Sequence, residues 1–166
     1  MEFSAGVAGT QFGTVAPVII GAYGIKDGVE LEGRYEDEYI ALTPRLQLFK
    51  SETFFLDGLT FFELGYNRQN SFQWGPGFMI GKRWNFFEPY FSYRFRHFSA
   101  LSKKQEKEFL GTKNLHYLKF GNRFYLPNLT CSPKVPSKWF IGVEVGPTLF
   151  GSDAICEWAA NIGFDY

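Results

Sequence analysis

The fold can be read from residues 156–166, CEWAANIGFDY. From Cys156 onward every second side chain is apolar, whereas the side chains between them are small or polar. An alternation of period two puts the two sets on opposite faces of a β-strand. We therefore expect a strand here with one apolar face and one face of small and polar residues.

The same alternation runs back through the chain. Trp139, Ile141 and Val143 alternate with Gly142 and Glu144, for example. The pattern predicts ten candidate strands, at residues 2–12, 15–25, 28–36, 39–50, 54–66, 74–84, 87–99, 115–126, 138–149 and 155–166. Because residues 2–25 keep one parity, the first two also fit one bent strand, so we expect eight to ten strands.

Two short stretches depart from the alternation. Residues 101–110 are rich in Lys and Glu and are expected to hold one helical turn within a loop. Gly75-Pro76-Gly77 falls at the start of the candidate strand 74–84 but has the composition of a turn. No shift in composition marks a domain boundary, so residues 1–166 are expected to form a single domain.

Composition narrows the classes of function. The chain has 166 residues, with 17 Lys and Arg against 17 Asp and Glu, so its net charge is zero. A nucleic-acid-binding protein normally has a basic excess, so we expect no nucleic acid partner. Aromatic residues make up 20% of the chain and there are 18 glycines, a composition that favours strands and tight turns over disorder.

Hydropathy excludes one way of crossing a membrane and leaves another. No apolar stretch approaches the ~18 residues that a membrane helix needs, whereas a barrel strand needs only ~9–11. Alternation alone does not say which face points outward, since a soluble barrel and a membrane barrel have opposite arrangements. The lipocalin-like alternative, a soluble lipid carrier with its aromatic face inside, therefore stays open at this stage.

Two features favour the membrane arrangement. The small and charged residues would fill a narrow lumen. Aromatic residues also stand at strand ends, where interface girdles lie; they are Tyr66, Trp74, Trp84, Tyr125, Trp139, Trp158 and Tyr166. We therefore predict an all-β protein, an antiparallel up-and-down transmembrane β-barrel of eight to ten strands with its apolar face outward.

The terminal run Ile162-Gly163-Phe164-Asp165-Tyr166 resembles the C-terminal signal of bacterial outer-membrane β-barrel proteins. Those usually end in Phe, and this chain ends in Tyr166. The resemblance implies a bacterial outer-membrane location, contact with lipid and lipopolysaccharide, and recognition by the insertion machinery through Ile162, Phe164 and Tyr166. It also implies that a signal peptide has been removed, and that both termini and residues 127–137 are periplasmic, whereas residues 100–114 are extracellular.

The charged residues of the inward set have mixed signs. They are Glu30, Glu32, Arg34, Arg45, Glu63, Arg94, Arg96, Lys119, Arg123 and Glu144. A selective pore would favour one sign. We therefore expect a small barrel with a filled, salt-bridged lumen and a structural or interaction role.

One pair of residues points to chemistry. His97 and Ser99 are two positions apart, so they share a face of strand 87–99 and lie about 6.5–7 Å apart along it. That face is the lipid side, at the extracellular end of the strand. A Ser beside a His is a candidate nucleophile that could attack an ester at the membrane surface.

Residues 93–99, YRFRHFS, resemble the motif of the outer-membrane lipid A deacylases, a His-x-Ser after a Tyr-Arg-Phe-like strand. The resemblance implies an esterase in which Ser99 is the nucleophile, His97 the base and Glu106 the acidic orienter, with Glu108 as its substitute. Two departures stand against it. The family usually has Asn after the Ser, where this chain has Ala100, and about three strands follow the motif here where the family has one.

The remaining reactive side chains predict no cofactor and no metal. Cys131 and Cys156 are too few for a disulfide scaffold, and their spacing with His97 and His116 fits no zinc motif. We expect the two cysteines near opposite membrane surfaces. Because a disulfide needs Cα atoms within about 7 Å, they should be unpaired.

Overall fold

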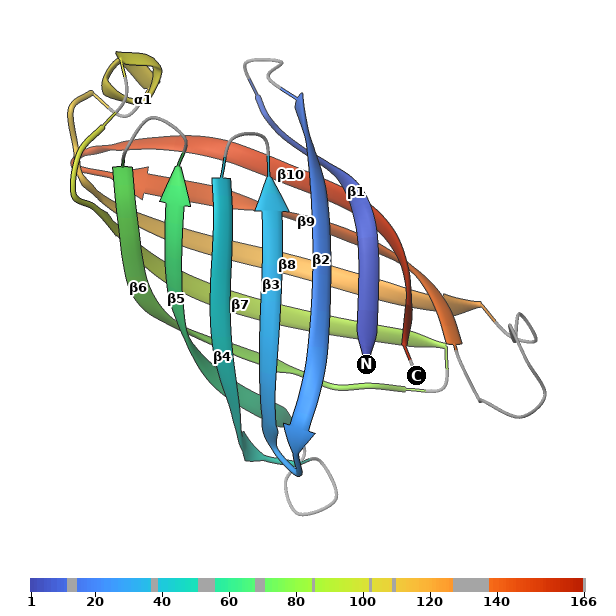
Figure 1. The fold of residues 1–166 in the computed structure, drawn as a ribbon. Helices are drawn as coiled ribbons and strands as arrows, with labels where there is room; N and C mark the ends of the chain where they lie inside the picture. The colour runs from blue at the N-terminus through green and yellow to red at the C-terminus, as the bar shows by residue number, and fades with distance from the viewer. Residues whose placement is uncertain are drawn as a thin grey trace.

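The computed structural model describes residues 1–11, 15–36, 39–50, 56–67, 71–84, 86–101, 103–108, 110–126 and 138–165. In these residues ten antiparallel strands form one closed barrel, in the order β1-β10-β9-β8-β7-β6-β5-β4-β3-β2 (Figure 1). The strands are β1 (Glu2–Thr10), β2 (Val15–Lys26), β3 (Val29–Glu36), β4 (Tyr39–Phe49), β5 (Asp57–Asn67), β6 (Ser71–Gly81), β7 (Phe87–Phe98), β8 (Asn114–Leu126), β9 (Lys138–Phe150) and β10 (Asp153–Asp165). The predicted all-β up-and-down barrel is confirmed.

The chain ends and the short helix α1 lie at opposite ends of the barrel (Figure 1). Helix α1 (Lys103–Glu108) follows β7, within the stretch that was expected to hold a helical turn. Both termini lie at the other end, as an even number of up-and-down strands requires. No helix in the described part of the chain is long and apolar enough to cross a membrane.

Of the two alternatives left open for residues 2–25, the structure has two strands and not one bent strand, and one detail of the predicted strands is wrong. β1 and β2 are separate strands that pair with each other, from Glu2 opposite Ala22 to Gly9 opposite Val15. Residues 75–77 do not form a turn but lie inside β6, which begins at Ser71.

Residues 75–77 fit a strand because they alternate between the lumen face and the outer face. The glycines at both ends of this stretch are buried on the lumen side, whereas Pro76 is exposed opposite Phe62. Proline has no N–H to donate, and the pairing of β6 with β7 is interrupted here, between Trp74 opposite His97 and Gly77 opposite Arg94. Turn-forming residue types are thus used within a strand to keep its lumen face free of side chains.

The apolar face points outward. Phe120 is 61% exposed, Val143 45% and Trp158 37%, whereas Phe91 and Phe164 are partly covered by their neighbours. The polar set points inward, and its most enclosed members are Ser4, Glu32, Thr43, Glu63, Ser71, Gln73 and Thr148. This is the arrangement predicted for a membrane barrel, and it is the opposite of what the lipocalin-like alternative requires.

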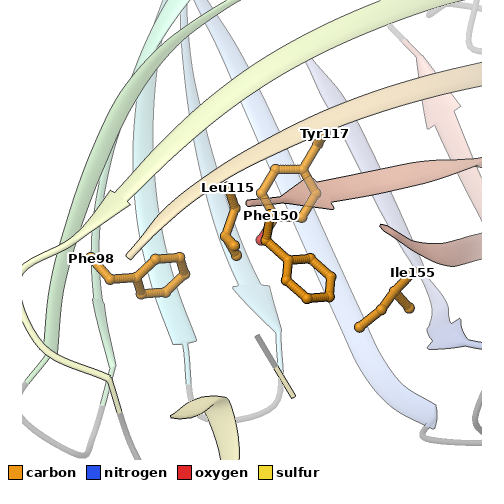
Figure 2. Packing of buried hydrophobic residues seen from close by; sticks show 5 residues of the cluster. All are labelled: Phe98, Leu115, Tyr117, Phe150 and Ile155. Carbon is orange, nitrogen blue, oxygen red and sulfur yellow. The ribbon is translucent and has the colours of Figure 1, made fainter. Parts of the chain in front are cut away.

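The lumen is not polar throughout. At the end that carries α1, inward side chains of β7, β8, β9 and β10 form an apolar cluster (Figure 2). Its members are Phe98, Leu115, Tyr117, Phe150 and Ile155, and Leu101 packs against it from the loop. Side chains rather than open space therefore line this side of the barrel mouth.

Candidate functional site

A buried carboxylate lies in the lumen. Glu63 of β5 is fully buried, and two arginines of β7 meet it, with Arg94 Nη1 2.8 Å from Oε2 and Arg96 Nε 2.6 Å from Oε1. The Tyr39 hydroxyl of β4 donates to Oε1 at 2.8 Å. We call Tyr39, Glu63, Arg94 and Arg96 the Glu63 cluster. A buried charge is tolerated only when it is paired and hydrogen-bonded, and Glu63 is both.

Glycines on β6 make this contact possible. β6 lies between β5 and β7, and its inward positions opposite the cluster are Gly75 and Gly77. A Cβ at Gly77 would lie 2.2 Å from Cζ of the Phe61 ring, and one at Gly75 would clash with the backbone of β7. The side chains of β5 and β7 therefore meet over a strand that has none of its own at this point.

Arg96 carries the cluster across the lumen. Its guanidinium carbon lies 5.1 Å from the centre of the Tyr39 ring and 4.7 Å from that of Tyr117. Tyr39 belongs to β4 and Tyr117 to β8, with β5, β6 and β7 between them in a ring of ten strands. Contacts of this kind between a cation and aromatic faces are favourable, and here they join opposite walls of the barrel.

The other inward charges are also paired, as predicted. Arg34 meets Glu36 at 2.8 Å, Lys119 meets Glu157 at 2.6 Å and Arg123 meets Glu2 at 3.1 Å. Arg45 forms an ion pair with Glu32 and lies 4.0 Å from Glu30, and the Tyr90 hydroxyl donates to Glu144 at 3.1 Å. Every charged residue expected in the lumen thus takes part in an ion pair or hydrogen bond. Of the partners, Glu2, Glu36, Tyr39 and Tyr90 were not anticipated, although their parity with known inward residues could have indicated them.

The two residues of the proposed rim site face outward at the α1 end, as expected. The His97 ring lies 5.4 Å from the ring of Trp74, which is exposed on the outer surface of β6. Ser99 is two residues further along the chain, just after β7 ends at Phe98. Its hydroxyl accepts a hydrogen bond from the backbone N–H of Phe72 at 3.0 Å. Both groups therefore sit on the lipid-facing side of the barrel rim.

The described contacts do not bring the predicted triad together. In the part of the chain that the structure describes, no hydrogen bond joins His97 to Ser99 or either of them to Glu106. Glu106 is exposed in α1, and the side chain of Glu108 lies outside the described residues. A catalytic role for these residues stays a prediction.

The partner of His97 is an amide that sequence reasoning missed. Nδ1 of His97 lies 2.7 Å from Oδ1 of Asn114, which faces it directly across the β7–β8 pairing. Because an amide oxygen only accepts, Nδ1 donates the hydrogen bond and Nε2 is left as the basic nitrogen. Asn114 could have been found only by aligning β8 with β7 across the long loop between them.

A second histidine lies beside the first. Nδ1 of His116 is 2.9 Å from the hydroxyl of Tyr93, and both face outward. Lys113 Nζ donates to the backbone carbonyl of Ser99 at 3.1 Å. We call Tyr93, His97, Lys113, Asn114 and His116 the outer rim cluster.

The cysteine prediction is settled for one of the two residues. Cys156 is a free thiol on the exposed face of β10. Cys131 lies outside the described residues. The described part of the chain also holds no group of three or more His, Cys, Asp or Glu side chains suited to a metal ion.

Comparison with solved structures identifies the fold. The NanC porin matches over 99% of this chain and 98% of its own, with a TM-score of 0.56 and 9% sequence identity. The KdgM porin in complex with disordered oligogalacturonate matches over 100% and 99%, with a TM-score of 0.53 and 9% identity. The outer membrane enzyme PagL, at 12% identity and a TM-score of 0.45, is too dissimilar to support an inference. No protein-family model matches the chain, and no curated protein matches it in sequence.

These likenesses and the geometry agree. The chain has the closed antiparallel β-barrel fold of outer-membrane porins. Its outer surface is apolar and its inner surface is charged, which is the pattern of a barrel that spans a bilayer. The protein is therefore an outer-membrane β-barrel in architecture.

Proposed function

We propose that the protein is a structural or interaction barrel of the outer membrane with a closed lumen, and not a diffusion channel. The observation that carries this proposal is the Glu63 cluster, which joins β4 to β8 across the barrel. The apolar cluster on β7 to β10 adds a second filled layer at the α1 end. A channel would need a continuous polar path past both layers.

Conductance across a planar lipid bilayer tests the proposal. The folded protein is expected to show no steady single-channel current. A variant that combines Tyr39→Ala, Arg96→Ala, Phe98→Ala and Phe150→Ala shortens side chains of both layers and retains Arg94 and Glu63. This variant should conduct, which shows that the protein inserts in the assay. A steady current through the unmodified protein would overturn the closed lumen.

The alternative function is a lipid esterase of the lipid A deacylase type at the barrel rim. The hydrogen bond from His97 to Asn114 favours it, because a base needs a fixed tautomer before it can activate a neutral Ser. Ser99 would attack the ester carbonyl and transfer its proton to Nε2 of His97. His97 would then protonate the departing alkoxide as the ester C–O bond breaks, and water would hydrolyse the acyl-Ser99 to release the fatty acid. Its hydroxyl must first leave the N–H of Phe72, which requires a rotation of the side chain.

Release of fatty acid tests this alternative. Folded protein in detergent micelles is incubated with lipopolysaccharide, and free fatty acid is measured over time. Ser99→Ala should abolish release without changing the barrel, because Ser99 is exposed. Intact lipid A after incubation with the unmodified protein, or release that persists in Ser99→Ala, would end the esterase hypothesis.

The insertion machinery of the outer membrane is the proposed partner of the last strand. Ile162 is exposed on the outer face of β10 and Phe164 lies partly exposed on the same face, while Tyr166 is outside the described residues. Phe164→Ser should lower the amount of barrel assembled in the outer membrane more than Ala160→Ser does on the same face. Equal assembly of the two variants would contradict recognition through Phe164.

A further inference from the structure

The outer surface of the barrel changes character around its rim. At the α1 end of β2, β3, β4, β5 and β6 the outward side chains are aliphatic or aromatic and exposed; they are Val15, Tyr35, Ile40, Tyr66 and Phe72. On β7 and β8 the same face carries His97, Asn114 and His116 instead. Polar side chains on the lipid face of a barrel are costly near the midplane and are tolerated near the interface. Among the described residues of β2 to β8, the polar outward groups at this end lie on the hairpin of β7 and β8, which indicates a local use.

The hydrogen bonds within the outer rim cluster leave other polar groups of its side chains unused. Each imidazole has its Nδ1 engaged, His97 with Asn114 and His116 with Tyr93. In the described part of the chain neither Nε2 has a hydrogen-bond partner. Lys113 has three N–H donors and uses one on the Ser99 carbonyl. The cluster therefore presents two imidazole nitrogens and an ammonium group at the membrane surface.

The sign of this cluster favours an anion. It holds one lysine and two histidines and no carboxylate. His97 lies opposite Asn114 and Phe95 lies opposite His116, so the two histidines are diagonal neighbours on adjacent strands. Diagonal neighbours lie ~7–8 Å apart, and a phosphate that accepts one hydrogen bond of about 2.8 Å on each side spans a gap of this size.

The surroundings favour a lipid as the source of the anion. The ring of Trp74 lies 5.4 Å from that of His97, and the Phe95 ring lies 5.2 Å from that of His116. Amphipathic aromatic residues mark the level of lipid headgroups, with hydrocarbon on one side and phosphate on the other. A lipid headgroup phosphate would meet the imidazoles while its acyl chains lay along the apolar strands.

We propose that the outer rim cluster is a binding site for the phosphate of a membrane lipid headgroup. His116 donates to it through Nε2–H when the Tyr93 hydroxyl donates to its Nδ1. His97 uses its Nδ1–H on Asn114, so it donates through Nε2 with both ring nitrogens protonated, and the Lys113 ammonium adds charge. Asn114 and Tyr93 are positioning residues that hold the two rings by Nδ1. The proposal rests on the outer-membrane placement of the barrel and names a partner for its rim. It requires no catalysis by Ser99.

Binding of lipid A to the folded protein in neutral detergent tests the proposal. The probes are lipid A with its phosphates, the same lipid after removal of the phosphates, and inorganic phosphate as a competitor. Binding is followed by native mass spectrometry and by the fluorescence of Trp74, for which Trp74→Phe is the blank. The unmodified protein should bind the phosphorylated lipid at least tenfold more tightly than the dephosphorylated one.

Variants locate the site. The double variant His97→Gln with His116→Gln keeps polar side chains of similar size and should lose that tenfold preference. Asn122 lies on the outer face of β8, the strand of His116, but outside the cluster, so Asn122→Ala should keep the preference. Equal binding of the two lipids by the unmodified protein, or an unchanged preference in the double variant, would overturn the proposal. Tight binding of inorganic phosphate with no preference among lipids would also overturn it, because the ligand would then be a free anion.

The outcome is separable from that of the closed lumen. The binding assay uses micelles and depends only on a folded barrel. Circular dichroism checks that each variant is still folded. If the protein conducts and still prefers phosphorylated lipid, the closed lumen is contradicted and the lipid site is supported. If the barrel is closed and shows no preference for phosphorylated lipid, the lipid site is contradicted and the closed lumen is supported.

Discussion

Arg96 and His97 are neighbours in β7 and both are basic, yet they belong to different environments. Arg96 is 9% exposed, and its guanidinium meets a carboxylate and two aromatic rings inside the lumen. His97 faces the other way and pairs with one amide at the rim. Inside the barrel each described charge meets a partner from the chain itself, whereas the outer rim cluster has polar groups without a partner among the described residues. The paired charges stabilise the lumen, and the outer rim cluster is the proposed site of lipid contact.

The largest expected effect lies in the Glu63 cluster. Glu63→Ala leaves Arg94 and Arg96 without their carboxylate in a buried site, so the free energy of unfolding should fall by about 3–5 kcal/mol. Chemical denaturation of the protein in detergent micelles measures this change. Lys107→Ala in the exposed helix α1 is the control and should change stability by less than about 0.5 kcal/mol. A small loss in Glu63→Ala would mean that the lumen does not depend on this carboxylate.

The next effect tests the outer surface. Val143 lies near the middle of β9 and is 45% exposed to the lipid side. Val143→Arg should destabilise the barrel in a bilayer by about 2–4 kcal/mol, because a charge at the midplane loses its hydration. Unfolding from lipid vesicles is the measurement, and Val143→Leu should be close to neutral. A neutral Arg at this position would contradict the outward apolar face.

A smaller effect is expected where a ring covers a glycine. The Tyr90 ring lies over Gly121, and a Cβ there would be 2.2 Å from its Cζ atom. Gly121→Val should cost about 1–3 kcal/mol by overpacking. The double variant with Tyr90→Ala should lose less free energy of unfolding than the two single variants lose in sum, because the clash disappears. Full additivity would show that the ring and the glycine do not interact.

The smallest effect on stability is expected at the rim. His97→Gln should change the free energy of unfolding by no more than about 0.5 kcal/mol, because His97 is partly exposed and outside the lumen network. The same variant should weaken the preference for phosphorylated lipid. Denaturation and lipid binding measured on one preparation separate the two readouts. A loss of stability as large as that of Glu63→Ala would make His97 a structural residue.

Much of the fold could be predicted because period two is a local property. The alternation around Trp139 and Val143 required only the order of residues, and it divided the side chains of each strand between two faces. The aromatic strand ends and the small, charged residues then indicated which face lines the lumen. The rim position of His97 and Ser99 followed from the same rule. The misassigned turn at residues 75–77 shows its limit, since composition alone does not distinguish a turn from a strand that must stay bare on one face.

The sequence by itself determined that the chain is a barrel, which side chains face the lumen and that they carry mixed charge. Only the tertiary structure decided that Glu63 meets two arginines over β6, that Asn114 holds His97, and that Phe98 and Ile155 share an apolar cluster at one mouth. The reason is physical. The face of a residue depends on its own strand, whereas its partner depends on the register between strands and on the closure of the whole sheet.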